Sequence, residues 1–323
     1  MKAALAVTLL AVAVAPATAT AEFPGTSLQR LSAAPSRNPA ISQDRRFARL
    51  AAFEADTGAT TNVYVVRRAG GYGENGTPWH AGATVLASRG LGGEAANGPS
   101  TQPSLDGASR VAPHCVAFAS DARNLSSLDG NHATDVYQRV MTRRYGPRIH
   151  GTCHQRLQMD TRLVSMAGNG RAGAGPSDSP ASNVDGSVVA FVTTASNLHG
   201  TAGRTQVVKA LLDRGRRPRL RLASRTSRRA PGNGPSTAPS VTAGGTWVLF
   251  ESDATDIGLT TARSPDINGV RDAMLATEPS GERWLLGERG TRGPTTNPMT
   301  SPHGNYVVFE RGGHAYLLYV GPK

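Results

Sequence analysis

The stretch Asn233–Leu275 reads NGPSTAPSVTAGGTWVLFESDATDIGLTTARSPDINGVRDAML, and its parts recur along nearly the whole chain. From Pro239, a glycine follows after six residues and a phenylalanine, Phe250, after eleven. The same offsets return in two other places, Pro180-Gly186-Phe191 and Pro298-Gly304-Phe309. Two looser copies, Pro39 to Phe53 and Pro103 to Phe118, carry small insertions. Because a repeated unit usually buries its apolar face by stacking on its own copies, the repeat predicts the architecture.

Each copy predicts four strands. Four copies contain a dipeptide that favours positive φ and is typical of a hairpin turn: Asp106-Gly107, Asp185-Gly186, Gly244-Gly245 and His303-Gly304. The run after the turn, such as Trp247–Phe250, is apolar at successive positions, which suits a strand covered on both faces. Two further strand-like runs follow, such as Asp272–Leu275 and Trp284–Gly287. The segment before the turn supplies the fourth strand.

Four-stranded units covered by their neighbours predict an all-β fold, a β-propeller of antiparallel blades. We expect five blades, at about residues 36–90, 97–170, 174–228, 232–290, and 292–323 together with 25–33. The last copy ends after three strands, and Ser27–Leu31 (SLQRL) is similar to a fourth strand. We therefore expect this amino-terminal strand to pair with the last blade and close the ring. Six blades are the alternative, if the 77-residue step from Pro103 to Pro180 contains a degenerate copy.

The segment Ser301–Phe309, together with Ser252–Asp256 and Asp266–Asp272, resembles the TolB-type, WD40-like propeller repeats of bacterial envelope and secreted proteins. In those repeats a Ser-Pro-Asp-Gly turn precedes a Val/Ile-Ala-Phe strand. This chain departs from the pattern at His303 and at Thr242-Ala243. The resemblance covers roughly residues 27–320. It implies a propeller with a tendency to bind other molecules, and no single reaction.

Residues 1–21 are predicted to be a signal peptide, with Lys2, an apolar core from Ala3 to Ala15 and small residues at its end. We expect residues 22–323 to form one propeller domain, secreted or periplasmic, without a membrane span once the leader is removed. Cys115 and Cys153 are the only cysteines. In that compartment they are compatible with one disulfide, and a pair of free thiols is the alternative.

The pattern Asp-x-Asn-x-x-x-Asp occurs twice before a predicted strand, as Asp129, Asn131, Asp135 and as Asp266, Asn268, Asp272. Clustered side-chain oxygens on a tight loop are ligands that calcium selects, and the resemblance to the family's acidic loops supports this. The alternative is that these residues form Asx-turns at the strand entry. The third copy has lost the acids, so we expect no required cofactor and keep calcium as a candidate.

The formal net charge is +12, and arginines concentrate near the third copy. This arginine stripe could bind an anionic partner, with candidate residues Arg214, Arg216, Arg217, Arg219 and Arg221. For an exported protein, the expected anion is a cell-wall or surface polymer. A solvated, arginine-rich hairpin is the alternative. Aromatic residues make up only 5% of the chain, so we expect no nucleic-acid partner.

No Gly-x-Ser-x-Gly elbow, His-Glu-x-x-His or phosphate-binding Gly-rich loop occurs in the sequence. We therefore expect no catalytic residues, and a binding module whose partner is a protein or a cell-envelope polymer. One alternative is a propeller enzyme acting on polysaccharide, a lyase or a glycosidase, with its site in the central tunnel. Another is binding of anionic polymer through the arginine stripe. An enzyme should show a cluster of perturbed ionisable groups at the centre.

Overall fold

The computed structural model describes residues 30–42, 49–69, 81–107, 114–141, 161–201, 203–213, 216–257, 269–277, 282–286, 293–301 and 305–319. Within these residues the chain is all-β apart from one short 3-10 turn, η2 (Ser196–Leu198). Its strands form five separate antiparallel sheets, and within each sheet the strands pair in chain order. The five predicted repeats are thus confirmed as five sheets.

The strands of the five sheets, in chain order, are β1 (Ser36–Ile41), β2 (Leu50–Asp56), β3 (Thr61–Arg68) and β4 (Ala81–Leu86); β5 (Ser100–Leu105), β6 (Cys115–Ser120), β7 (Asp135–Val140) and β8 (Thr161–Leu163); β9 (Ser177–Ser182), β10 (Val188–Thr193), β11 (Gln206–Leu211) and β12 (Arg219–Leu222); β13 (Ser236–Val241), β14 (Trp247–Ser252), β15 (Asp272–Thr277) and β16 (Arg283–Leu285); and β17 (Thr295–Thr300), β18 (Tyr306–Arg311) and β19 (His314–Tyr319).

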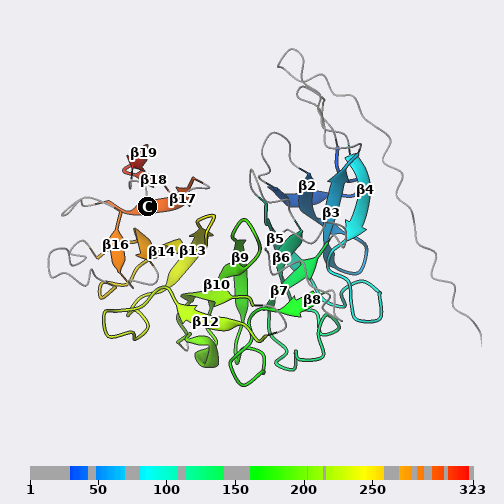
Figure 1. The fold of residues 1–323 in the computed structure, drawn as a ribbon, viewed down its shortest axis with the longest axis horizontal. Coiled ribbons are helices and arrows are strands. Elements are labelled where there is room, and N and C mark those ends of the chain that lie inside the picture. Colours follow the sequence, from blue (N-terminus) through cyan, green and yellow to red (C-terminus); the bar gives the residue numbers. More distant parts are fainter. Residues whose placement is uncertain are drawn as a thin grey trace, which may run out of the picture.

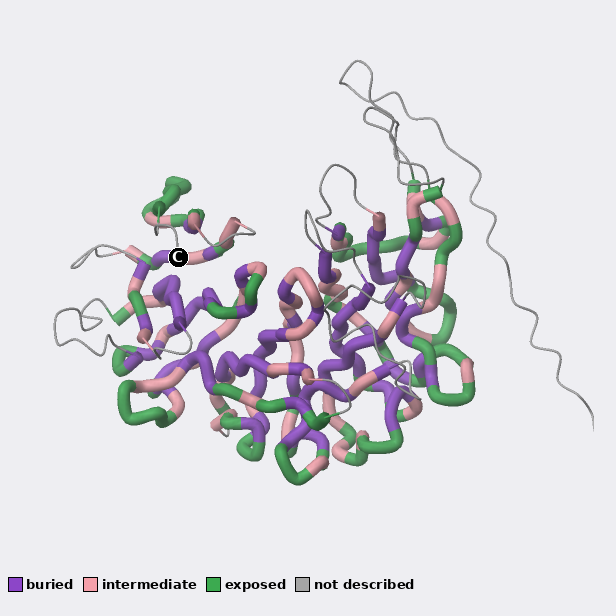
Figure 2. Tube along the Cα trace, viewed as in Figure 1, coloured by how far each residue is buried: buried purple, intermediate pink, exposed green. Residues whose placement is uncertain are grey.

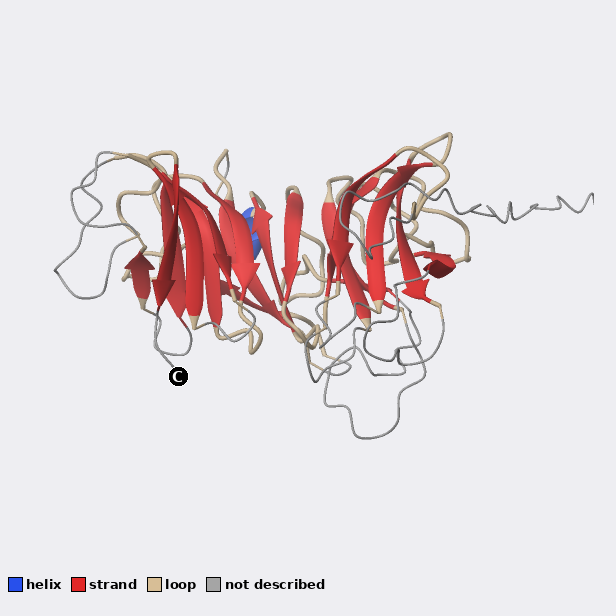
Figure 3. Cartoon of the chain, turned by 90° about the horizontal axis from the view of Figure 1, so that it is seen from above, coloured by secondary structure: helices blue, strands red, loops and turns tan. Residues whose placement is uncertain are grey.

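The sheets follow one another along an arc (Figure 1). The first strand of each sheet contacts the first strand of the next, from β1 through β5, β9 and β13 to β17. These five are therefore the inner strands, and the last strand of each sheet lies on the outside. In Figure 1 the arc is open between the first sheet and the last, and Figure 3 shows the strands standing side by side along it.

Apolar clusters fill the space between successive sheets. The predicted run of each sheet supplies them, so that Phe118 packs with Ala52 and Val63 of the preceding sheet, and Phe309 with Leu249. Strands β6, β10 and β14 are buried along their whole length, which confirms the expected cover on both faces. The expectation is wrong for β18, which alternates between exposed and buried residues because no described sheet follows it. Figure 2 shows the buried positions following the middle strands and the exposed positions of the last sheet.

The anchor prolines mark an unusual backbone conformation. The residue before each of them has a positive φ of 47° to 55°, and the inner strand shifts register there: Asn38, Gln102, Ser179, Ala238 and Asn297. A residue before proline normally takes an extended conformation, so the repeat was not expected to place a bulge here. Because this conformation recurs in all five sheets, the bulge is a regular feature of the inner strands.

The turn prediction is partly wrong. Gly107, Gly186 and Gly245 have the expected positive φ. Asp106 is not a turn residue: its Oδ1 accepts the backbone N–H groups of His114 and Cys115 at 2.8 and 2.9 Å. Asn183 and Thr242 hold the same place in the next two sheets, with Asn183 Oδ1 accepting Val188 N at 2.9 Å. The sequence spacing placed the turn of the second copy at Asp106 because the loop that follows Asp106 is longer than the matching loops of the other copies. His303-Gly304 lies outside the described residues.

Closure of the ring is not established by the fold. The fifth sheet has three described strands. Arg30 and Leu31 are not in a strand, and residues 27–29 lie outside the described part of the chain. Leu31 packs on the first sheet, against the cluster of Phe53, Ala55 and Val66. The amino-terminal strand pairing therefore stays a prediction.

Candidate binding face at the inner strands

Four of the five residues before the anchor prolines are polar, and all five lie on the inner strands of the arc. Asn38, Gln102 and Asn297 are exposed, Ser179 is half-buried, and the fourth sheet has exposed Ala238 instead. An amide side chain offers both a donor and an acceptor, so this line of residues can recognise peptide or sugar groups through hydrogen bonds. We call these five residues the inner face.

Backbone N–H groups of the inner face are bound by side chains of the preceding sheet. Gln102 N donates to Glu54 Oε1 at 2.6 Å, and Asn297 N donates to Glu251 Oε1 at 2.7 Å. Between the second and third sheets, Ser179 N donates to Gln102 Oε1 at 2.8 Å. The side chains of one sheet thereby fix the backbone of the face in the next.

The carboxylates beside the face are paired with arginine. Buried Glu54 lies 3.0 Å from Arg37 Nε and accepts from Asn38 Nδ2 at 2.7 Å. Arg37 also pairs with Asp56, whose pKa is lowered by hydrogen bonds from Thr61 and Arg37. At the fourth sheet, Arg271 binds both oxygens of Asp253 at 2.8 and 2.9 Å. That pairing lowers the pKa of Asp253. The lowered pKa values keep Asp56 and Asp253 ionised, which disfavours a role for either as general acid.

Strongly shifted pKa values occur at Asp106, Asp135 and Tyr137, and each of these side chains makes hydrogen bonds within its own sheet. Burial raises the pKa of Asp106 to about 8, and the pKa of Asp135 to about 7. Burial and the neighbouring Asp129 raise the pKa of Tyr137. Asp106 caps the start of β6, and Asp135 and Tyr137 belong to β7. Their perturbation has a structural cause in each case.

The first predicted calcium loop is assembled by internal hydrogen bonds. Asn131 Nδ2 donates to Asp135 Oδ2 at 2.7 Å, and Tyr137 Oη donates to Asp129 Oδ2 at 2.6 Å. In the second loop, Asp272 Oδ1 accepts from Thr295 at 2.9 Å, while Asp266 and Asn268 lie outside the described residues. The part of the chain that the structure describes contains no group of three His, Cys, Asp or Glu side chains arranged as metal ligands. Calcium binding stays a prediction, which a chelator-induced fall in Tm would support.

A repeated hydroxyl clasp holds the start of the third strand in each of the first four sheets. Ser88 Oγ donates to Asn62 Oδ1 at 2.7 Å and accepts Val63 N at 3.1 Å. Three further hydroxyls make the same pair of bonds: Ser165 with Asp135 and Val136, Ser224 with Gln206 and Val207, and Thr295 with Asp272 and Ala273. The three serines follow the fourth strand of their own sheet, whereas Thr295 comes from β17 of the next. Asp135 and Asp272 are thus clasp acceptors.

Sequence reasoning missed this clasp. The recurring Leu-x-Ser at residues 86–88, 163–165 and 222–224 was a readable signal for the three serines. No such signal marks Thr295, because glycine follows Leu286 at the matching place.

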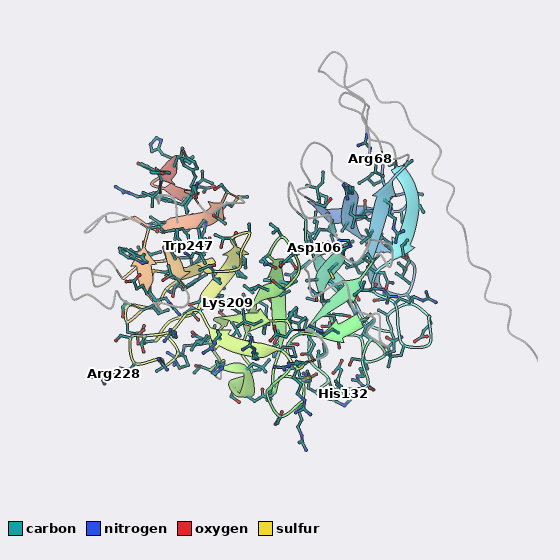
Figure 4. All side chains as sticks on the ribbon, in the orientation of Figure 1. Arg68, Asp106, His132, Lys209, Arg228 and Trp247 are labelled. Atoms are coloured by element: carbon teal, nitrogen blue, oxygen red, sulfur yellow. The ribbon has the colours of Figure 1, made fainter. Side chains whose placement is uncertain are left out.

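The arginine stripe lies on the outer side of the third sheet. Arg216, Arg217, Arg219 and Arg221 are exposed, and Arg214 lies outside the described residues. Arg219 pairs with Asp213 at 2.9 Å, and Arg217 donates to Gly168 O at 3.0 Å. Figure 4 places Arg228 on the outside of the arc, away from the inner strands. Charge on an outer edge strand also protects it from pairing with other chains.

Cys115 opens β6 and is disulfide-bonded. Its predicted partner, Cys153, lies outside the described residues, so this pairing stays a prediction. No helix among the described residues is long and apolar enough to cross a membrane.

Five successive up-and-down sheets with the first strand innermost place the chain among β-propeller folds. TolB from Acinetobacter baumannii is similar, with 14% identity and a TM-score of 0.42 over 88% of this chain and 51% of that one. The β-propeller domain of the Trilobed protease from Pyrococcus furiosus has 8% identity and a TM-score of 0.38 over 89% and 83%. A Hadza microbial sialidase has 9% identity and a TM-score of 0.45 over 85% and 52%. The chain spans about half the length of TolB and of the sialidase. No family model and no curated protein matches the sequence.

Proposed function

We propose that this chain is an exported, TolB-type β-propeller that binds a protein or cell-envelope polymer at its inner face and performs no chemistry there. The main supporting observation is that the two carboxylates bound to inner-face N–H groups are both paired with arginine: Glu54 with Arg37, and Glu251 with Arg271. A hydrolytic site needs a carboxyl group poised to exchange a proton. A closed ring is part of this proposal, because a face made of converging strands is complete only when the first and fifth sheets meet.

The first test compares binding with two matched variants. Peptides selected from a random display library on the purified chain serve as protein-like probes, and soluble peptidoglycan fragments as polymer probes. In Gln102→Ala/Asn297→Ala, the inner-face amides become the alanine that the fourth sheet already carries at Ala238. In Arg219→Gln/Arg221→Gln, the outer strand loses two charges. We expect affinity for the bound probe to fall at least tenfold in the first variant only.

Enzymatic turnover of a sugar substrate would contradict the binding proposal. Release of reducing sugar from arabinoxylan or of sialic acid from sialyllactose, lost in Glu54→Gln, would replace the binding proposal with the enzyme alternative. Binding that is reversed by salt and lost only in the arginine variant would favour anionic-polymer binding instead. That second candidate is supported by the exposure of Arg216 and Arg221 on one outer surface.

A further inference from the structure

The inner-face residue of the fourth sheet lacks an acceptor that its counterparts have. The backbone N–H groups of Gln102, Ser179 and Asn297 each donate to a side-chain oxygen of the preceding sheet, at 2.6 to 2.8 Å. Ala238 has the same φ of 51° as Ser179 and Asn297, at the same register shift of its inner strand. Its N–H group is therefore directed to the third sheet, as theirs are directed to the sheets that precede them.

The middle strand of the third sheet carries no acceptor at this place. The carboxylate acceptors Glu54 and Glu251 directly follow the phenylalanine of their sheets. The matching residue of the third sheet is Val192. It is 3% exposed and packs in the apolar cluster between the third and fourth sheets. Its methyl groups cannot accept a hydrogen bond.

The inner strand of the third sheet does not supply the acceptor either. In the second sheet, Gln102 accepts the next N–H group through its own side chain. Ser179 holds the matching position, but its side chain is shorter and its hydroxyl donates to Asp178 Oδ1 at 2.8 Å. No side chain of the described residues accepts a hydrogen bond from Ala238 N. Because Ala238 is exposed and its strand is fixed by the sheet, this N–H group is a pre-oriented donor for a ligand oxygen.

The charges around Ala238 favour a neutral ligand oxygen. Asp178 lies on the neighbouring inner strand β9, while Glu251 and Asp253 lie on and just after β14. Arg271 pairs with the last two, so these three carboxyl groups outnumber that arginine. The excess of negative charge disfavours a ligand carboxylate and favours an uncharged carbonyl group.

A peptide fits the chemistry of this face. Gln102 and Asn297 add side-chain amides, each of which offers a donor and an acceptor to a peptide group. An extended peptide presents a carbonyl oxygen and an N–H group along its whole backbone, whereas a sugar with an N-acetyl group presents one amide per ring. We propose that Ala238 N–H is the donor of a ligand subsite between the third and fourth sheets, and that it binds a backbone carbonyl oxygen of an extended peptide segment. This subsite rests on the proposed binding function of the inner face and specifies the partner as a protein.

Filling the acceptor place tests the subsite. In Val192→Gln, the amide oxygen should bind Ala238 N as Gln102 binds Ser179 N, so the ligand loses its donor. Val192→Met has a side chain of the same length without an acceptor oxygen and is the matched control. We expect the affinity for a display-selected peptide to fall about three- to tenfold in Val192→Gln only.

The outcomes separate this subsite from the binding function on which it rests. Equal affinities of the two Val192 variants for a peptide that Gln102→Ala/Asn297→Ala weakens would overturn the subsite and leave the inner-face proposal standing. A wild-type chain that binds no peptide at this face would overturn both.

Amide exchange measured by NMR tests the donor without a variant. In the unliganded chain, Ala238 N–H should exchange with solvent at least about tenfold faster than the N–H groups of Gln102 and Asn297, and the peptide should slow it. Equal exchange at the three positions, or exchange at Ala238 that the peptide leaves unchanged, would overturn the proposal. Tri-N-acetylchitotriose is the second probe. Slower exchange at Ala238 with this sugar and not with the peptide would show that the ligand is an acetylated sugar, which contradicts the peptide assignment.

Discussion

Arg283 Nε donates to the carbonyl oxygen of Ala223 at 2.6 Å. Arg283 belongs to the fourth sheet and is fully buried, while Ala223 directly follows β12, the outer strand of the third. A second bond, from Nη2 to Leu222 O at 3.2 Å, joins the same two sheets. A buried guanidinium with carbonyl acceptors thus connects the outer strands of neighbouring sheets.

Replacing this arginine should weaken the contact between the two sheets. Arg283→Ala leaves the carbonyl groups of Leu222 and Ala223 buried without this donor, which costs about 1.5 to 3 kcal/mol. Urea unfolding followed by circular dichroism measures the loss. Arg221→Ala, exposed on the neighbouring β12, is the control and should stay within about 0.5 kcal/mol of wild type. Equal effects of the two substitutions would show that Arg283 does not join the sheets.

Removing one clasp hydroxyl should destabilise its whole sheet. Ser224→Ala deletes the donor to Gln206 and the acceptor of Val207 N, both of which are buried. We expect a loss of about 1 to 3 kcal/mol in the free energy of unfolding. Ser127→Ala, at an exposed loop position, should have no measurable effect. A Ser224→Ala protein as stable as this control would remove the clasp from the account.

The carboxyl group of Asp135 should make stability depend on pH. Burial raises its pKa from 3.8 to about 7 in the folded chain, so the folded state holds the proton more tightly than the unfolded state does. This stabilising contribution is complete below about pH 3.8 and is lost as the pH rises through about 7. Thermal unfolding from pH 5 to 8.5 should therefore show a falling Tm.

Asp135→Asn should flatten that fall, because an amide does not titrate. The variant should be less stable than wild type at pH 5, where its amide cannot accept from both Asn131 and Ser165, and the difference should shrink above pH 8. Asn62 shows that an asparagine can hold the clasp position. Parallel curves for wild type and variant would contradict the buried-carboxyl explanation.

Close approach of another backbone segment explains why a glycine recurs at Gly98 and Gly234, just before the inner strands. A Cβ at Gly234 would lie 2.5 Å from the backbone carbonyl of Asp253, and one at Gly98 would lie 2.8 Å from that of Asp121. Because backbone cannot move away as a side chain can, Gly234→Ala should cost several kcal/mol or prevent folding. Gly130→Ala, which has open space around its Cβ, should cost less than about 1 kcal/mol. The two variants can be compared by soluble yield and by Tm.

Sequence spacing predicted the five sheets because the apolar runs and turn glycines recur as a unit. It could not align Asp106, since the loop to His114 is longer than in the other copies. It could not reveal the inner face either: positive φ before proline contradicts the local preference of the chain, and only the register shift of each inner strand shows it. The acceptors of the clasp vary among Asn, Asp and Gln and share no pattern, so only the recurring Leu-x-Ser of three copies could have indicated it.

The most direct test of the binding account is hydrogen–deuterium exchange of the purified chain with and without a display-selected peptide, read by mass spectrometry. The account predicts that protection appears at the inner strands β1, β5, β9, β13 and β17, and is reduced in Gln102→Ala/Asn297→Ala. Protection confined to the outer strand β12, with the inner strands unchanged, would contradict it.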